Sequence, residues 1–115
     1  MTPTMTNYKA GDIVLVEFTF TDGTGSKKRP ALIISSEGYN KSRQEVIVAA
    51  ITSNIERILF GDTMIDDWKE AGLIYPSLVT GIIRTIKSSM IDRKLGLLTK
   101  QDFQKVRENI RKAAG

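Results

Sequence analysis

Three cations stand directly before a proline at the start of a predicted strand. Lys27, Lys28 and Arg29 precede Pro30 and a run of apolar residues. A guanidinium stays protonated and presents paired N–H donors in one plane, and lysines add point charges. The cluster could therefore bind a phosphate-containing anion and stabilise charge that develops on it. The alternative is solvated loop charge, with Arg29 paired to Asp22 in the preceding loop. These residues alone favour neither interpretation.

The residue types that are absent restrict the chemistry further. The 115-residue chain has no cysteine and no histidine. This excludes disulfides and thiol chemistry, removes the commonest general base near neutral pH and makes a zinc site unexpected. We expect no metal and no cofactor, so acid–base steps would depend on Arg, Lys, Thr, Ser, Tyr, Asp or Glu.

The charge and the hydropathy indicate where the chain acts and on what. With 17 Lys and Arg against 13 Asp and Glu, the net charge is +4, which favours an anionic partner. No apolar run is long enough for a membrane span, and residues 1–11 lack the apolar core of a signal peptide. We therefore expect a cytoplasmic protein without membrane contact.

Strands predominate among the elements that must position these side chains. β-Branched and apolar runs predict strands, and turn residues separate them. The predicted strands cover residues 12–18, 29–35, 45–53, 56–65 and 81–89, with loops at 19–28 and 36–44 and a short middle helix at 66–72. The order shows no βαβ alternation, so a small, partly closed antiparallel barrel with appended helices fits best. We expect one domain over residues 1–115, with residues 1–8 as a loose leader.

The clearest helix is predicted over residues 99–114. Thr99 can cap its start, and Asp102 three residues later makes a variant of the capping box. Phe103, Val106 and Ile110 then fall on one face at helical spacing. This C-terminal helix should cover part of the sheet.

Several predicted strands are apolar on both faces. Residues 12–18 and 45–53 place apolar side chains at successive positions, whereas a half-exposed antiparallel sheet should have one polar face. Either the core is fully internal, or a second copy of the chain covers the surplus. We favour the second explanation and predict a homodimer.

Six sequence segments, taken together and in this order, resemble the MazF/PemK family of toxins. They read GDIVLVEF, GSKKRPALIIS, VIVAAITS, YPSLV, IRTI and DRKLGLLTKQDF, and the resemblance covers residues 9–112. It implies an SH3-like barrel of the CcdB/PemK type that acts as a homodimer. It also implies a sequence-specific endoribonuclease that cuts single-stranded mRNA without a metal. A cognate antitoxin would block the RNA site with a disordered tail, and the complex would bind DNA.

The resemblance assigns a catalytic pair. The family's arginine matches Arg29 in the Arg-Pro motif, and its threonine matches Thr52 in the Thr-Ser that closes the third strand. Without the resemblance, Thr52 is better explained as an ordinary strand-end residue. The 2′-OH of the RNA would attack the adjacent phosphorus and leave a 2′,3′-cyclic phosphate and a 5′-OH. Arg29 would stabilise the phosphorane, and Thr52 would bind a phosphate oxygen or relay a proton. The residues expected to contact the RNA are Lys27, Lys28, Asp22, Ser53 and Arg84.

One part of the family pattern is missing. Some members place an Arg, and two residues later an Asp, just after the Pro-Ser-x-Val region, where this chain reads VTGI at residues 79–82. Those roles do not transfer, and the general base stays open between Glu17 and Asp22. Two alternatives also remain. One is a gyrase-inhibiting toxin on the same barrel, although the C-terminal RENIRKAAG lacks the aromatic residue such toxins use. The other is a non-catalytic RNA-binding relative.

Overall fold

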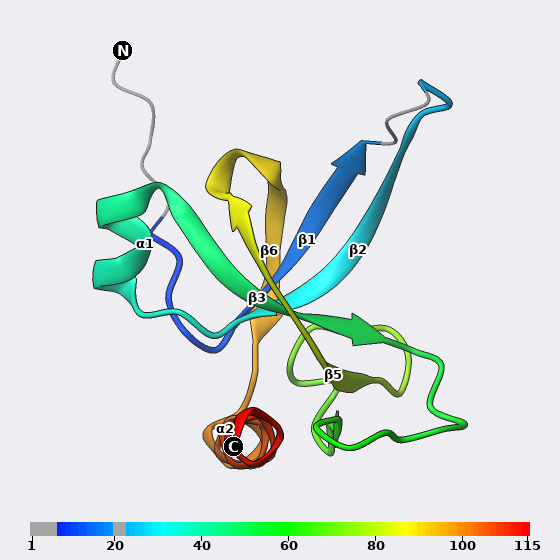
Figure 1. The fold of residues 1–115 in the computed structure, drawn as a ribbon. Helices are drawn as coiled ribbons and strands as arrows, with labels where there is room; N and C mark the ends of the chain where they lie inside the picture. The colour runs from blue at the N-terminus through cyan, green and yellow to red at the C-terminus, as the bar shows by residue number, and fades with distance from the viewer. Residues whose placement is uncertain (1–6, 20–22) are drawn as a thin grey trace.

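The strands form one antiparallel sheet with a helix at either end of the molecule (Figure 1). The computed structural model describes residues 7–19 and 23–115. The sheet has six strands in the order β4-β5-β3-β2-β1-β6. They span Asp12–Thr19 (β1), Ser26–Ile33 (β2), Glu45–Thr52 (β3), Thr63–Met64 (β4), Leu78–Lys87 (β5) and Ile91–Leu97 (β6). The helices are α1 (Glu37–Arg43) and α2 (Lys100–Ala114), and a 3-10 turn, η1 (Ser88–Met90), joins β5 to β6. The predicted class, mainly antiparallel β with helices, is confirmed, although the sheet stays open rather than closing into a barrel.

The alternation of side chains along the strands divides the core into two clusters, one on each face of the sheet. The first cluster includes Ile13, Leu32 and Ala49, and α2 covers it together with the segment 65–73. The second cluster gathers the neighbouring side chains of opposite parity: Val14, Val16, Ala31, Ile33, Val46, Val48 and Ile86. Most of the two-faced apolar character of the strands is therefore internal core. The predicted homodimer needs support from other residues.

Helix α2 begins and packs as its sequence predicts. The Thr99 side chain accepts a hydrogen bond from the N–H of Asp102 at 3.2 Å. Val106 is fully buried, and Phe103 and Ile110 pack against the same cluster. Neither helix of the described residues is both long and apolar enough to cross a membrane.

The segment 36–44 forms a helix and not the predicted polar loop. Ser36 accepts a hydrogen bond from the N–H of Tyr39, which satisfies one of the free donors at the start of α1. At the other end Gln44 takes a left-handed conformation with φ 53°, which closes the helix. Asn40 is the buried residue of this helix, and its side chain donates to the carbonyl oxygen of Tyr8 at 2.8 Å. A polar residue anchors α1, so no apolar periodicity marks it in the sequence.

The short helix predicted over residues 66–72 does not form. Residues 66–72 form a succession of turns, closed at Gly72 with φ 90°. This segment lies directly against β6. The contact is so close that a Cβ at Gly72 would collide with the carbonyl of Leu95, and a Cβ at Gly96 would collide with the carbonyl of Ala71. This backbone contact holds the segment against β6 without a helix.

Several strands also differ from the prediction. The predicted strand over 56–65 shrinks to the two residues of β4, because the segment before it turns at Gly61 with φ 98°. Strand β2 begins at Ser26, so residues 26–28 of the predicted loop pair with β1 instead. Strand β6 was not predicted. Register shifts in its pairing with β1 break the regular alternation that would have identified it.

Candidate functional site

The alternation of side chains along β2 distributes the three cations Lys27, Lys28 and Arg29 over the two faces of the sheet. In the β1–β2 ladder Lys27 faces Phe18 and Arg29 faces Val16, so both lie on the face of the second core cluster. Lys28 alternates to the opposite face. Lys27 and Arg29 therefore share one face of the sheet, and Lys28 lies on the other face.

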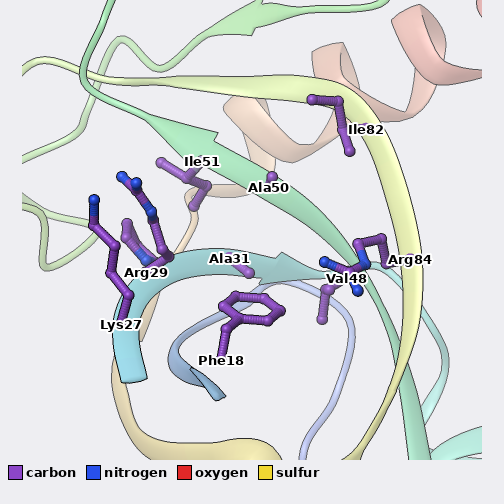
Figure 2. Close-up of a pocket in the computed structure, with 10 residues that line it drawn as sticks. Phe18, Lys27, Arg29, Ala31, Val48, Ala50, Ile51, Ile82 and Arg84 are labelled. Atoms are coloured by element: carbon purple, nitrogen blue, oxygen red, sulfur yellow. The ribbon is translucent and has the colours of Figure 1, made fainter. Parts of the chain in front are cut away.

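Lys27 and Arg29 line a pocket on that face, which we call the sheet pocket (Figure 2). Its volume is about 310 Å³. The lining residues come from β1, β2, β3 and β5: Phe18, Lys27, Arg29, Pro30, Ala31, Val48, Ala50, Ile51, Ile82 and Arg84. Figure 2 shows Lys27 and Arg29 toward one end and Arg84 toward the other, with Phe18 between them. The pocket thus combines an apolar floor with a cationic rim.

The cations of this rim are available to a ligand. Lys27, Arg29 and Arg84 form no ion pair with any carboxylate within residues 7–19 and 23–115. The guanidinium carbon of Arg84 lies 5.2 Å from the centroid of the Phe18 ring. An aromatic face attracts a cation at this distance and keeps the side chain over the pocket.

Thr52 lies at the end of β3, beside the Arg29 end of the pocket. The β2–β3 ladder pairs Ala31 with Ala50, and the same register extended by two residues sets Arg29 opposite Thr52. Thr52 is half-buried, and its hydroxyl oxygen accepts a hydrogen bond from the N–H of Asn54 at 3.1 Å. Its proton stays free to be donated. The exposed Ser53 follows directly, and neither of these two residues is among those that line the sheet pocket.

Other predicted residues lie elsewhere. Lys28 forms an ion pair with Asp92 at 3.4 Å on the opposite face of the sheet. Glu17, a candidate base, is the register partner of Lys28 and lines a separate hollow with Asp92. Glu17 thus lies on the face opposite Arg29, which argues against it as the general base at the sheet pocket. Asp22 falls outside the described residues.

The segment that lacks the family's Arg and Asp builds the wall of the pocket. Thr80 donates from its hydroxyl to the carbonyl of Ala50 at 2.8 Å, and the N–H of Gly81 donates to Asp62 at 2.9 Å. Ile82 is 61% exposed and faces the pocket. Ile82 and Phe18 are pocket residues that the sequence reasoning missed. The sequence contains a signal for both. Ile82 lies two residues before Arg84 and Phe18 lies two residues after Val16, so each pair should share one face of its strand.

No set of three or more His, Cys, Asp or Glu side chains converges on a possible metal position in the part of the chain that the structure describes. The chemistry available at the sheet pocket is therefore that of two guanidinium groups, an ammonium group and a neighbouring hydroxyl.

Comparison with solved structures identifies the fold. A MazE–MazF complex from Deinococcus radiodurans aligns with a TM-score of 0.82 and 20% identity, over 96% of this chain and 98% of that one. The Mycobacterium tuberculosis toxin MazF-mt6 aligns with a TM-score of 0.70 and 26% identity, over 88% and 95%. An endoribonuclease in complex with its cognate antitoxin, from a mycobacterial species, aligns with a TM-score of 0.76 and 16% identity, over 94% and 95%.

Comparison of sequences identifies the family. No curated protein sequence matches the chain. The family of PemK-like, MazF-like toxins of type II toxin–antitoxin systems matches residues 9–114, nearly the whole chain. The match spans β1 to α2 and includes the sheet pocket. The chain therefore belongs to the PemK-like, MazF-like family of type II toxins.

Proposed function

We propose that this chain is a sequence-specific, metal-independent endoribonuclease toxin that cleaves single-stranded mRNA at the sheet pocket. The observation that carries the proposal is the placement of Arg29. Its side chain is exposed at the rim of the pocket and has no carboxylate partner among the described residues, and the β2–β3 register, extended two residues beyond its last pair, sets it opposite Thr52. Similar solved structures are of endoribonucleases, one with its cognate antitoxin, which supports the same activity here.

Arg29 is proposed to stabilise the transition state. When the 2′-OH attacks the adjacent phosphorus, a P–O bond forms to O2′, the bond to the 5′ oxygen breaks, and negative charge gathers on the non-bridging oxygens. A planar guanidinium can donate two hydrogen bonds to those oxygens without changing its protonation. The strand and the following Pro30 fix the backbone of Arg29 and so limit the positions that its guanidinium can reach.

Thr52 is proposed to donate rather than to act as a base. A neutral hydroxyl is a weak base near neutral pH, and the lone pair of this one already accepts from Asn54. A hydrogen bond from Thr52 to a phosphate oxygen, with Ser53 beside it, would complement Arg29. Lys27 would hold a flanking phosphate on the same face, whereas Lys28 could only reach RNA that wraps around the edge of the hairpin.

Partners are proposed on the same basis. A cognate antitoxin would carry acidic residues to the cations of the sheet pocket and so exclude RNA in the cytoplasm, and their complex would bind DNA. A homodimer is supported by exposed apolar side chains away from the core, at Ile58, Leu59, Phe60, Ile74 and Tyr75. Sedimentation equilibrium tests it, and a monomer at micromolar concentration would contradict it.

The cleavage proposal is tested with purified protein and single-stranded RNA in EDTA. We expect products with 2′,3′-cyclic phosphate and 5′-OH ends. Arg29→Ala should lower the rate about 10²- to 10³-fold, as removal of one preorganised donor does elsewhere. The matched control is Arg93→Ala, an exposed arginine of β6 that pairs with Leu15 and so lies on the opposite face.

The alternatives give different results in the same assays. Full activity of Arg29→Ala, with its fold intact by circular dichroism, would refute the proposed mechanism. RNA binding without any cleavage product would indicate the non-catalytic relative. Loss of DNA supercoiling activity in a gyrase assay would indicate the gyrase-inhibiting class.

A further inference from the structure

The side chains of the sheet pocket offer hydrogen-bond donors and no acceptors. None of its ten described lining side chains carries an oxygen, whereas Lys27, Arg29 and Arg84 carry N–H donors. One backbone acceptor at the pocket, the carbonyl of Ala50, is already used by the hydroxyl of Thr80 at 2.8 Å. A ligand that brings its own N–H groups would leave them unpaired against these cations, which is unfavourable.

The middle of the pocket suits an aromatic base. The Phe18 ring lies between its two cationic ends (Figure 2), and Ala31, Val48 and Ala50 form a flat apolar floor beside it. Unpaired bases of single-stranded RNA stack on aromatic side chains of this kind. The volume of about 310 Å³ is within the range of small-molecule sites.

The two arginines are placed for different parts of a nucleotide. Arg29 stands beside Thr52, where the phosphate chemistry is proposed. Arg84 lies toward the other end of the pocket, 5.2 Å from the Phe18 ring centroid. Because the Arg84 guanidinium lies over the Phe18 ring, a base that stacks on this ring displaces Arg84 toward the edge of the base, where the fork can donate to it, while the adjoining phosphate reaches Arg29.

Two base edges present a pair of adjacent acceptors to a guanidinium fork, and only one of them carries no amino group, which matters in a pocket whose side chains offer no acceptor. Guanine presents N7 and O6 as two adjacent acceptors with no amino group between or beside them on that edge. Adenine places an amino donor beside N7, and uracil separates its acceptors O4 and O2 by the N3–H donor. Cytosine presents N3 and O2 as adjacent acceptors, but its N4 amino group lies beside N3 on the same edge. The fork would meet a donor on adenine, and only one of its two hydrogen bonds would form to uracil. On cytosine both bonds could form, but the neighbouring amino group would be left without an acceptor.

We propose that the sheet pocket binds a guanine of the RNA next to the scissile phosphate, with Phe18 as the stacking surface and Arg84 donating to O6 and N7. This inference rests on the proposed function, since it assigns part of the sequence preference of that site. It predicts that cleavage sites carry guanine at one fixed position within two nucleotides of the cut.

The test begins with the wild-type chain. Cleavage ends are mapped on a mixed RNA, and kcat/KM is then measured on an oligonucleotide that carries the guanine and on its adenine and 7-deazaguanine versions. We expect each replacement to lower kcat/KM about tenfold or more, because adenine lacks O6 and 7-deazaguanine lacks N7, so each loses one of the two acceptors. Binding of the same oligonucleotides with 2′-O-methyl groups, which removes the nucleophile, is measured by fluorescence anisotropy.

Variants then assign the preference to Arg84. Arg84→Met keeps the length and apolar character of the side chain, and we expect the guanine-to-adenine ratio to fall to within twofold. Arg84→Lys keeps the charge but not the fork, and should give a ratio between those of the wild type and Arg84→Met. The matched control is Lys87→Met on the same strand, which alternates to the other face and should keep the wild-type ratio.

The outcomes separate this inference from the proposed function. Cleavage without a guanine preference, or a wild-type ratio in Arg84→Met, would overturn the inference and leave the nuclease proposal standing. Guanine-selective binding of the 2′-O-methyl oligonucleotide with no cleavage of unmodified RNA would support the inference and reject the nuclease proposal. Equal binding of the guanine and adenine oligonucleotides would overturn the inference whether or not RNA is cut.

Discussion

The buried carboxylate of Asp102 is expected to hold α2 to the turns at residues 66–72, which we call the turn segment. Replacement of Asp102 by asparagine measures how much this contact contributes to the free energy of unfolding. Asp102 is 1% exposed and accepts hydrogen bonds from the backbone N–H groups of Asp67 at 3.0 Å and Asp66 at 3.3 Å. Lys105 pairs with it at 3.4 Å. Since the first core cluster lies beneath this contact, Asp102 joins the helix to the part of the chain that covers the core.

The magnitude follows from the bonds that asparagine cannot make. Asp102→Asn keeps one oxygen but turns an NH₂ donor toward a backbone N–H, so one charge-assisted hydrogen bond is lost. Such a bond contributes about 1.5–3 kcal/mol to the free energy of unfolding. For a chain of this size we expect Tm to fall by about 6–12 °C at pH 7, measured by differential scanning calorimetry. The control is Asp66→Asn, which removes the exposed partner of the same lysine and should cost under about 1 kcal/mol.

The pH dependence gives a second test of the same contact. Burial acts to raise the pKa of the Asp102 carboxyl, but the N–H groups of Asp67 and Asp66 and the ammonium of Lys105 outweigh it and hold this pKa below its ordinary value. The stabilisation is therefore complete above the unfolded-state pKa of about 4 and is lost as pH falls through the lower folded-state pKa. The Tm difference between wild type and Asp102→Asn should persist at pH 5–7 and shrink below pH 4. A difference that stays constant down to pH 2 would refute this reasoning, as would a loss in Asp66→Asn as large as that in Asp102→Asn.

Two glycines should respond to alanine in opposite directions. Gly96→Ala should cost about 3 kcal/mol or more in urea unfolding, because its Cβ would collide with the backbone carbonyl of Ala71, and an unchanged midpoint would contradict the close approach of β6 to the turn segment. Gly38→Ala, at the second residue of α1 where an added Cβ meets open space, should raise stability by about 0.5 kcal/mol, and a loss of stability would show that α1 is not a helix in solution.

Local patterns predicted the elements whose sequence signals were strong. Strands over 12–18 and 45–53 and the helix over 99–114 carry continuous β-branched runs or a capped apolar face, and the structure confirms them. The turn segment at 66–72 was misjudged because acidic residues and a closing glycine resemble helix ends. What decides its conformation is the non-local contact between Gly72 and Leu95, which no local pattern contains.

The candidate site was predictable in part for the same reason. The Arg-Pro motif drew attention to Arg29, and the resemblance assigned Thr52, but only the register of β2 and β3 sets them opposite one another. Lys28 and Arg29 are adjacent cations, and composition does not reveal that they lie on opposite faces of the sheet. The pairing of Lys28 with Glu17 on the other face is what separates them. Residue types predict which chemistry is possible, whereas the alternation of side chains along a strand decides which residues lie on the same face and can act together.

The same alternation separates function from stability in this fold. The face that carries Arg29, Arg84 and Thr52 is open at the sheet pocket, whereas α2 and the contacts of Asp102 stabilise the opposite face. Substitutions at the rim should therefore change RNA cleavage with little effect on unfolding, because they remove exposed side chains without opening a cavity. Substitutions at the Asp102 contact should lower stability without altering the preference for a base, since no residue there reaches the pocket. Paired measurement of Tm and cleavage rate on Arg84→Met and Asp102→Asn tests this independence, and a shared loss of both properties in either variant would show that the two faces are coupled.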